Sequence, residues 1–379
     1  QVGGNIDSLT GSIDIDAGNG DLVLGNLRAV SGIFLRTDNG DIQVAGANAD
    51  SDQINGGNLS FTATGLGNSA LPAAIRASGL LSGNTVALNA AGDLDVAAVA
   101  SLNDIFAIAG GNISASGDWT GGTATSFDAI DVQSTGGGNI LLQNLSAGDI
   151  FVGDQASSHH AGNIVVGNVT ATDQIDIESD SGTVSTGALS STSNSIEVQT
   201  NNADMSIAGA LAPNRVRLNA GNGTLALGGL VQSNLVDILA ANVAGSLIDI
   251  HQLSGALTLN TGLISAHTIR VQTEEALTIN GALDAGSTGT VSLLSSNSSV
   301  SAGNVTAQDL GVTATQLQFG NLMLGGQLDL DASSGNIQLG QVIAGTVDLL
   351  ASGNLNYVSL NANGNASLQA GANISGGNL

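Results

Sequence analysis

The sequence repeats a short pattern at intervals of about 20 residues, and this periodicity limits the chain to a small set of folds. Each copy begins with glycine and a second residue, polar in all but one of the copies below, followed by two aliphatic residues that flank a variable one. Copies of this pattern occur at Gly20–Leu24, Gly40–Val44, Gly92–Val96, Gly162–Val166, Gly223–Leu227, Gly255–Leu259 and Gly335–Leu339. A repeat of this length is typical of a solenoid, in which each copy forms one turn.

Two more short segments with alternating aliphatic residues follow within each repeat. After Gly162–Val166 they are Gly167–Ala171 and Ile175–Ile177. Because successive side chains of a strand point to opposite faces, each segment has one apolar face. Coiling three such strands into a triangular turn buries these faces, and stacking the turns about 4.8 Å apart satisfies their backbone hydrogen bonds. The sequence therefore predicts an all-β, right-handed parallel β-helix with three short strands per turn.

The composition agrees with a narrow aliphatic interior. Hydrophobic residues make up 42% of the chain, but aromatic residues only 2%, whereas a compact globule of this size normally buries many rings. A β-sandwich is the main alternative, since it also has many short strands. Sandwich strands are joined by tight hairpin turns and show no such self-similarity, so we favour the β-helix.

The repeat is regular from Gly162 onward and irregular before it. Three insertions exceed the period, at about 46–57, 62–84 and 114–126. We therefore expect one continuous solenoid, with loop insertions in residues 1–161 and a plain stalk in residues 162–379. Both ends resemble ordinary repeat fragments, so we expect the natural chain to be longer.

The insertions supply the binding candidates, because insertions in a solenoid form loops that often lie on the binding side. Ile75 and Arg76 fall in the second insertion, and Trp119, the one tryptophan of the chain, falls in the third. These residues are predicted to contact a ligand or partner. The alternative is that the loops fold their own apolar residues against the solenoid.

The charge of the chain excludes several classes of partner. The net charge is −25, with six arginines and no lysine. Such a surface repels phosphate backbones and anionic lipids, so we expect no nucleic-acid partner. No apolar run approaches the ~20 residues of a membrane span, so we expect no membrane insertion. The absence of cysteine leaves stacking, rather than disulfides, to stabilise the fold.

The densest acidic run lies at residues 173–180. Asp176 and Glu178 alternate on a predicted strand, while Asp173 and Asp180 belong to the flanking turns. Because calcium prefers carboxylate oxygens, these four residues are candidates for a weak calcium site. The alternative is a solvated acidic face. We expect no other metal and no organic cofactor.

An enzymatic role must be weighed, because some parallel β-helices cleave or eliminate polysaccharides. Such sites use clustered carboxylates for acid and base steps, basic residues to stabilise charge, and aromatic residues to hold sugars. Here the carboxylates are dispersed, lysine is absent and aromatic residues are scarce. We therefore expect no catalysis and assign no catalytic or cofactor-binding residue.

Several repeats resemble those of a known family. Gly111–Ala115, Gly138–Leu142 and Gly353–Tyr357 resemble the filamentous-haemagglutinin-type repeats of bacterial exoproteins, as do Leu360–Ala362 and Leu368–Ala370. The resemblance covers most of the chain. It implies a two-partner-secretion exoprotein that passes through an outer-membrane transporter and is secreted or held at the bacterial cell surface. Members of this family serve as adhesins, biofilm-matrix scaffolds or toxin-delivery stalks.

The combined expectation is a structural stalk of a large secreted surface adhesin, which mediates attachment or biofilm contact and thereby virulence. Its expected partners are the transporter during export and a glycan or protein receptor on the host cell or matrix. Lateral or end-to-end self-association is a further possibility. Two other functions remain open: a self-assembling surface-layer or filament subunit, and a glycan-active β-helix enzyme.

Overall fold

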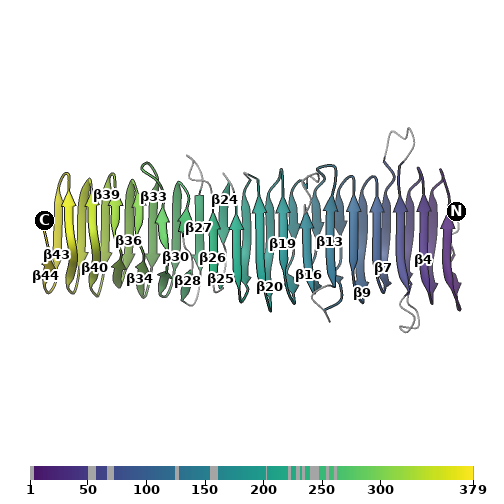
Figure 1. Ribbon diagram of the computed structural model, residues 1–379, viewed down its shortest axis with the longest axis horizontal. Helices are drawn as coiled ribbons and strands as arrows, with labels where there is room; N and C mark the ends of the chain where they lie inside the picture. The colour runs from purple at the N-terminus through teal and green to yellow at the C-terminus, as the bar shows by residue number, and fades with distance from the viewer. Residues whose placement is uncertain are drawn as a thin grey trace. The chain divides into compact units, whose positions relative to one another are not determined.

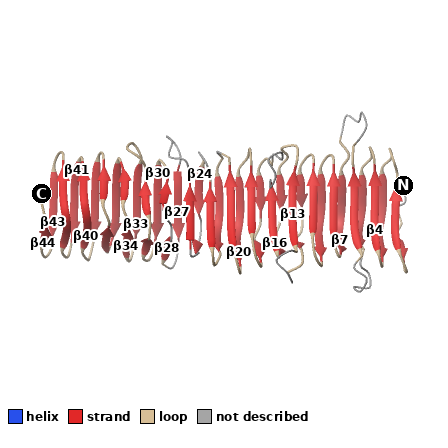
Figure 2. Ribbon diagram, in the orientation of Figure 1, coloured by secondary structure: helices blue, strands red, loops and turns tan. Residues whose placement is uncertain are grey.

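The computed structural model describes residues 4–49, 57–65, 72–123, 128–153, 161–201, 203–220, 223–227, 231–232, 235–239, 247–252, 256–259 and 263–378. Contacts divide the chain into two compact units, Gln1–Thr200 and Asn201–Leu379. The described elements of both units are β-strands (Figure 2).

The first unit contains β1 (Ile6–Ser8), β2 (Ser12–Asp16), β3 (Leu22–Ala29), β4 (Gly32–Thr37), β5 (Ile42–Asn48), β6 (Asn58–Ala63), β7 (Ile75–Gly83), β8 (Val86–Ala90), β9 (Leu94–Ser101), β10 (Ile105–Ala109), β11 (Ile113–Ala115), β12 (Trp119–Thr120), β13 (Ala129–Ser134), β14 (Ile140–Leu142), β15 (Leu145–Ala147), β16 (Asp149–Gly153), β17 (Ile164–Val166), β18 (Val169–Ala171), β19 (Ile175–Ser179), β20 (Val184–Ser191) and β21 (Ser195–Thr200).

The second unit contains β22 (Met205–Leu211), β23 (Arg215–Asn219), β24 (Thr224–Leu227), β25 (Val231–Gln232), β26 (Leu235–Leu239), β27 (Leu247–Gln252), β28 (Leu257–Leu259), β29 (Leu263–Ser265), β30 (Thr268–Thr273), β31 (Leu277–Ile279), β32 (Ala282–Asp284), β33 (Thr290–Ser295), β34 (Ser299–Ala302), β35 (Val305–Ala307), β36 (Asp309–Ala314), β37 (Gln316–Phe319), β38 (Leu322–Leu324), β39 (Gln327–Ala332), β40 (Ile337–Ala344), β41 (Thr346–Ala351), β42 (Leu355–Ala362), β43 (Ala366–Ala370) and β44 (Ile374–Gly376).

Each turn consists of three strands that pair in parallel with the same three strands of the next turn. In one turn these are β17, β18 and β19, which pair with β14, β15 and β16 of the preceding turn. The first two strands of a turn often run together into one longer strand, such as β20, which pairs with both β17 and β18. Strands β13, β16 and β19 follow one another along the first unit (Figure 1). The predicted parallel β-helix with repeats of roughly 20 residues is confirmed.

Alternation within each strand divides side chains between the core and the surface. In β19, Ile175 and Ile177 are fully buried, while Asp176 between them is only partly covered. The interior is a set of stacked aliphatic rows, since each buried residue lies over its equivalent in the neighbouring turn. In the second unit one such row is Val312, Leu330 and Leu349. Burial of these rows supplies the main driving force for folding.

Polar side chains at the corners form a second kind of row. The Asn112 side chain accepts a hydrogen bond from the backbone N–H of Asn139 at 2.9 Å, and Asn139 accepts one from Asn163 at 2.9 Å. The row continues to the backbone N–H of Thr183, which donates to Asn163 at 2.9 Å. Each amide therefore satisfies a backbone donor of the next turn, where the chain bends and strand pairing stops.

Replacing Asn139 by alanine removes the acceptor for the backbone N–H of Asn163. We expect the Asn139→Ala variant to lose about 1 kcal/mol of stability, the net value of one such hydrogen bond. Asn139→Asp keeps an acceptor oxygen at the same place and is expected to lose less. Urea unfolding of both variants measures the difference. Equal losses in the two variants would show that the hydrogen bond is not the cause.

The second unit contains one extra strand, which shifts the pattern around the turn. The segments at β26 and β27 both have the aliphatic–Asp–aliphatic sequence of a third strand, and they follow one another directly along the chain. Among the described residues, no glycine-led pair of strands lies between them. Strands β24 and β25 occupy the first two positions of their turn by pairing with β22, and β26 pairs with β23.

From β27 onward, each type of segment occupies the strand position that follows the one it occupied in the earlier turns. Strand β27 pairs with β24, β28 contacts β25, and β29 pairs with β26. The glycine-led pair β28 and β29 thus covers the second and third positions instead of the first and second. The shift persists, because β31 and β32 pair with β28 and β29, and β30 pairs with β27. One added strand therefore rotates the repeat by one third of a turn without interrupting the stack.

Candidate functional site

Two of the predicted binding residues are buried in the core. Trp119 is 1% exposed and lies in β12, where it pairs with Val99 of the turn before and Leu145 of the turn after. Ile75 is fully buried at the start of β7. The prediction that these two side chains contact a partner from a loop is therefore wrong, because both fill positions in the aliphatic rows.

The three predicted insertions also contain more strand than expected. Strand β5 extends into 46–57, β7 lies within 62–84 and the end of β6 extends into it, and β11 and β12 reach into 114–126. Residues 50–56, 66–71 and 124–127 lie outside the described part of the chain. The described residues within these ranges therefore include strands as well as loops.

Arg76, the third predicted binding residue, lies on the surface of β7. Its Nη1 atom is 2.6 Å from Oδ2 of Asp41, and the two side chains are 47% and 41% exposed. The other carboxylate oxygen of Asp41 accepts the backbone N–H of Ala74 at 2.9 Å. Arg76 is therefore held against a corner row. An ion pair this exposed contributes at most about 1 kcal/mol.

The four calcium candidates lie on and beside one strand. Asp176 and Glu178 lie on β19, and Asp173 and Asp180 flank it, as predicted. Glu178 accepts a hydrogen bond from Gln199 at 3.1 Å, and Asp173 accepts one from Ser193 at 3.3 Å. Within the described ranges, which include all four residues, no group of three or more potential ligands is arranged to hold a metal. These four described residues thus show no preformed calcium cluster, and the weak calcium site stays a prediction.

The most irregular surface of the first unit lies at a β-bulge in β7. The register of β7 shifts against β5 between Ala77 and Leu81 and against β9 between Ala77 and Leu80, so β7 has one residue more than its neighbours. Gly79 permits the bulge, because a Cβ atom there would lie 2.3 Å from the carbonyl oxygen of Ala45. The extra residue turns Leu80 outward, where it is 52% exposed. Bulges of this kind often re-aim a side chain next to a functional site.

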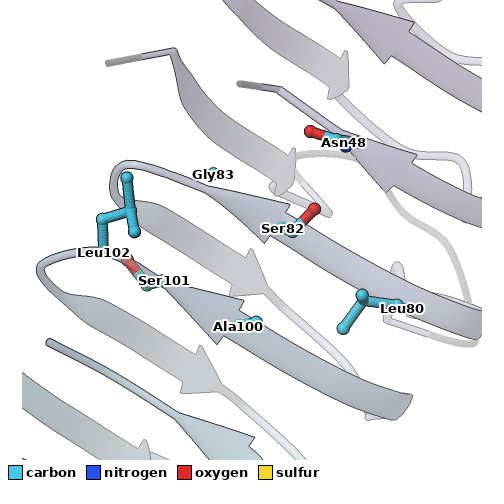
Figure 3. Close-up of a pocket in the computed structure, with 7 residues that line it drawn as sticks. All are labelled: Asn48, Leu80, Ser82, Gly83, Ala100, Ser101 and Leu102. Carbon is cyan, nitrogen blue, oxygen red and sulfur yellow. The ribbon is translucent and has the colours of Figure 1, made fainter. Parts of the chain in front are cut away.

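Two grooves meet at Leu80. The first has a volume of about 350 Å³ and is lined by residues of β1, β3, β5 and β7, including Asp7, Arg28 and Asn48. The second, of about 310 Å³, shares Asn48, Leu80 and Ser82 with the first and extends to Leu102. Figure 3 shows Leu80 and Leu102 on opposite sides of the second groove, with Ser82 and Ala100 between them.

A third groove, of about 470 Å³, lies on the other side of the bulge. Arg76 lines it together with Gln43, Ser78 and Asp95. The predicted binding residue Arg76 thus borders a groove. The volumes are in the range of ligand-binding clefts, and the linings are mixed polar and apolar.

The first groove contains a row of polar residues that face outward on consecutive strands. Asp7, Arg28, Asn48 and Ser82 are register partners on β1, β3, β5 and β7. Arg28, which the structure describes, is not part of the ion pairs that join Arg36 to Asp38 and Arg76 to Asp41. Its guanidinium group is therefore available to a ligand.

Sequence reasoning missed Arg28, Asn48, Leu80 and Leu102. The signal for Leu80 was present, since Gly79 is followed by Leu80 and Leu81, whereas the equivalent Gly46 is followed directly by the inward Ala47. Two successive leucines cannot both point inward on a strand, so one of them had to be exposed. The grooves themselves depend on side chains from four turns and have no signature in any single repeat.

The carboxyl group of Asp149, in the first unit, has a perturbed pKa. Burial raises the pKa of Asp149 above its ordinary range; the hydrogen bond from the backbone N–H of Gln174, at 2.9 Å, opposes this, and the charge of Asp173 adds to it. The folded state therefore favours the protonated form. As the pH rises through the folded pKa, the cost of ionising Asp149 lowers the stability of the fold.

Asp149→Asn removes this charge and keeps an oxygen that accepts the hydrogen bond from Gln174. We expect the variant to have a higher melting temperature than the parent at about pH 7, and no difference at about pH 3, where the carboxyl is protonated in both states. Thermal unfolding at the two pH values measures the effect. A gain of equal size at both values would show that the charge is not responsible.

The fold and its surface define a parallel β-solenoid repeat protein. A scan against protein-family models and searches among curated proteins and solved structures found no match. The described residues contain no apolar helix long enough to cross a bilayer.

Proposed function

We propose that the chain is a structural shaft segment of a large secreted bacterial surface adhesin and that it has no catalytic role. The observation that carries the proposal is the uniform stacking of parallel turns, in which aliphatic rows and asparagine rows repeat from turn to turn. In such a stack many weak interfaces between neighbouring turns add up to a stiff structure. The resemblance of the repeats to filamentous-haemagglutinin-type exoproteins supports export to the cell surface.

Surface labelling tests the location and the role in the bacterium that encodes the chain. Antibodies raised against the purified chain are expected to label intact cells or the extracellular matrix. Deletion of the coding region is expected to reduce attachment to host cells or to an abiotic surface. Labelling confined to permeabilised cells, or unchanged attachment after deletion, would contradict the proposal.

An enzymatic role makes a different prediction for the purified chain. A polysaccharide-cleaving β-helix would release reducing or unsaturated ends from bacterial or host polysaccharides. Under the shaft proposal no such ends are released. Their appearance over a control lacking the protein would replace the shaft function with a catalytic one.

A further inference from the structure

The row formed by Asp7, Arg28, Asn48 and Ser82 places one polar side chain on each of four consecutive turns. Neighbouring strands are about 4.8 Å apart, so the row presents hydrogen-bonding groups at that interval across the strands. This interval is close to the length of one pyranose ring in an extended sugar chain. A linear ligand with one hydroxyl-bearing unit per turn therefore matches the row.

The side chains of the groove suit hydroxyl groups. Carboxylate, amide and guanidinium groups each present two coplanar hydrogen-bonding atoms, which can engage two neighbouring hydroxyls at once. Gly46 lets Asn26 and the Leu80 backbone come close together at the floor of the groove, since a Cβ there would lie 3.2 Å from each. Leu80 adds an apolar surface, on which the C–H face of a sugar ring can pack.

The charge of the site favours a neutral ligand. Asp7 and Arg28 are register partners of opposite charge, so the two charges of the row cancel. The chain as a whole carries −25, which repels polyanions such as sulfated or uronic-acid-rich glycans. A neutral hexose chain carries no charge, so the net negative charge of the protein does not repel it.

We propose that the groove over β1, β3, β5 and β7 binds a neutral, hydroxyl-rich glycan chain that runs across the strands. This inference rests on the proposed adhesin function and names its ligand class. Arg28 and Asn48 hydrogen-bond the hydroxyls, and Leu80 packs against a ring. The bulge at Gly79 provides the apolar contact, because without the extra residue Leu80 has no outward position.

Calorimetry with the purified full chain tests the inference, using cellohexaose, maltohexaose and laminarihexaose as probes. At least one hexaose is expected to bind, and to bind more tightly than its disaccharide, because a longer chain reaches more turns. Arg28→Ala and Asn48→Ala are each expected to weaken binding by about tenfold or more. Arg36→Ala is the matched control: Arg36 lies on β4, outside the groove, and is expected to bind as the parent does.

Three results would overturn the inference: no binding of any neutral hexaose, equal loss with Arg36→Ala, or tighter binding of a sulfated glycan than of a neutral one. Circular dichroism of each variant identifies a loss of folding. If Arg28→Ala does not fold, Arg28→Gln retains a polar side chain and is expected to lose binding as well. Surface labelling of cells is independent of these measurements, so a shaft without a glycan site remains distinguishable from a failure of the proposed function.

Discussion

Replacing Trp119 by alanine is expected to destabilise the first unit by about 3–5 kcal/mol, because it empties the largest buried side-chain position of the core. Phenylalanine at the same position is expected to cost only about 1–1.5 kcal/mol. The indole Nε1 atom is buried and has no hydrogen-bond partner, so Trp119→Phe sacrifices no hydrogen bond. Urea unfolding followed by far-ultraviolet circular dichroism measures both variants, since the variants contain no tryptophan for fluorescence.

The contrast between the two variants separates a packing role from a polar one. If a partner bonded the indole N–H, Trp119→Phe would lose about 1–3 kcal/mol in addition to the change in packing. If Trp119 were instead a surface contact, Trp119→Ala would leave the unfolding midpoint near that of the parent. The first result would contradict the unpaired indole N–H, and the second would contradict the buried position in β12.

Gly153→Ala is expected to cost about 3 kcal/mol or more, or to prevent the first unit from folding. Gly153 ends β16 with φ of 108°, a conformation that residues with a side chain rarely adopt. A Cβ atom there would also lie 1.7 Å from the carbonyl oxygen of Glu178 in the next turn. Both effects act together, since relieving the contact requires separating two paired turns.

Gly311→Ala is the matched control. Gly311 also lies within a strand, β36, but a Cβ atom at this position meets nothing within 4 Å. The variant is expected to be neutral or more stable by up to about 1 kcal/mol, because alanine restricts the unfolded chain. Thermal unfolding of the two full-length variants gives the comparison. Similar losses in both would show that strand glycines are needed for a reason other than close contact between turns.

The fold was predictable because the repeat determines it at every turn. Alternation in Ile175–Ile177 gave the strand and the direction of each side chain, and both isoleucines are fully buried. The short segment Gly167–Ala171 gave the middle strand, which is β18. Equivalent residues of neighbouring turns stack on one another. A strand assigned in one repeat therefore predicts the equivalent strand in the others.

The candidate site was less predictable because it depends on departures from the repeat. Trp119 was assigned to a loop since the repeat lengthens around it. The added residues lie after Thr120 instead, and Trp119 keeps its place in the row between Val99 and Leu145. A break in period shows that residues have been added but not on which side of a given residue the addition lies.

The grooves, too, could not be predicted from any single repeat. Arg28 and Asn48 occupy ordinary outward positions, and neither is unusual within its own repeat. They become a site because Asp7 and Ser82 fall beside them and because one extra residue exposes Leu80. Such a surface can be found only after the register between turns is known.

The extra strand of the second unit has a consequence for how proteins of this kind diversify. The single added strand between β26 and β28 preserves the parallel pairing, because β27, which has the sequence of a third strand, stacks on the glycine-led β24, and β29 stacks on β26. Every corner that follows then points in a new direction. Duplication of one short segment can therefore redirect downstream side chains toward a different neighbour while the hydrophobic interior needs no redesign.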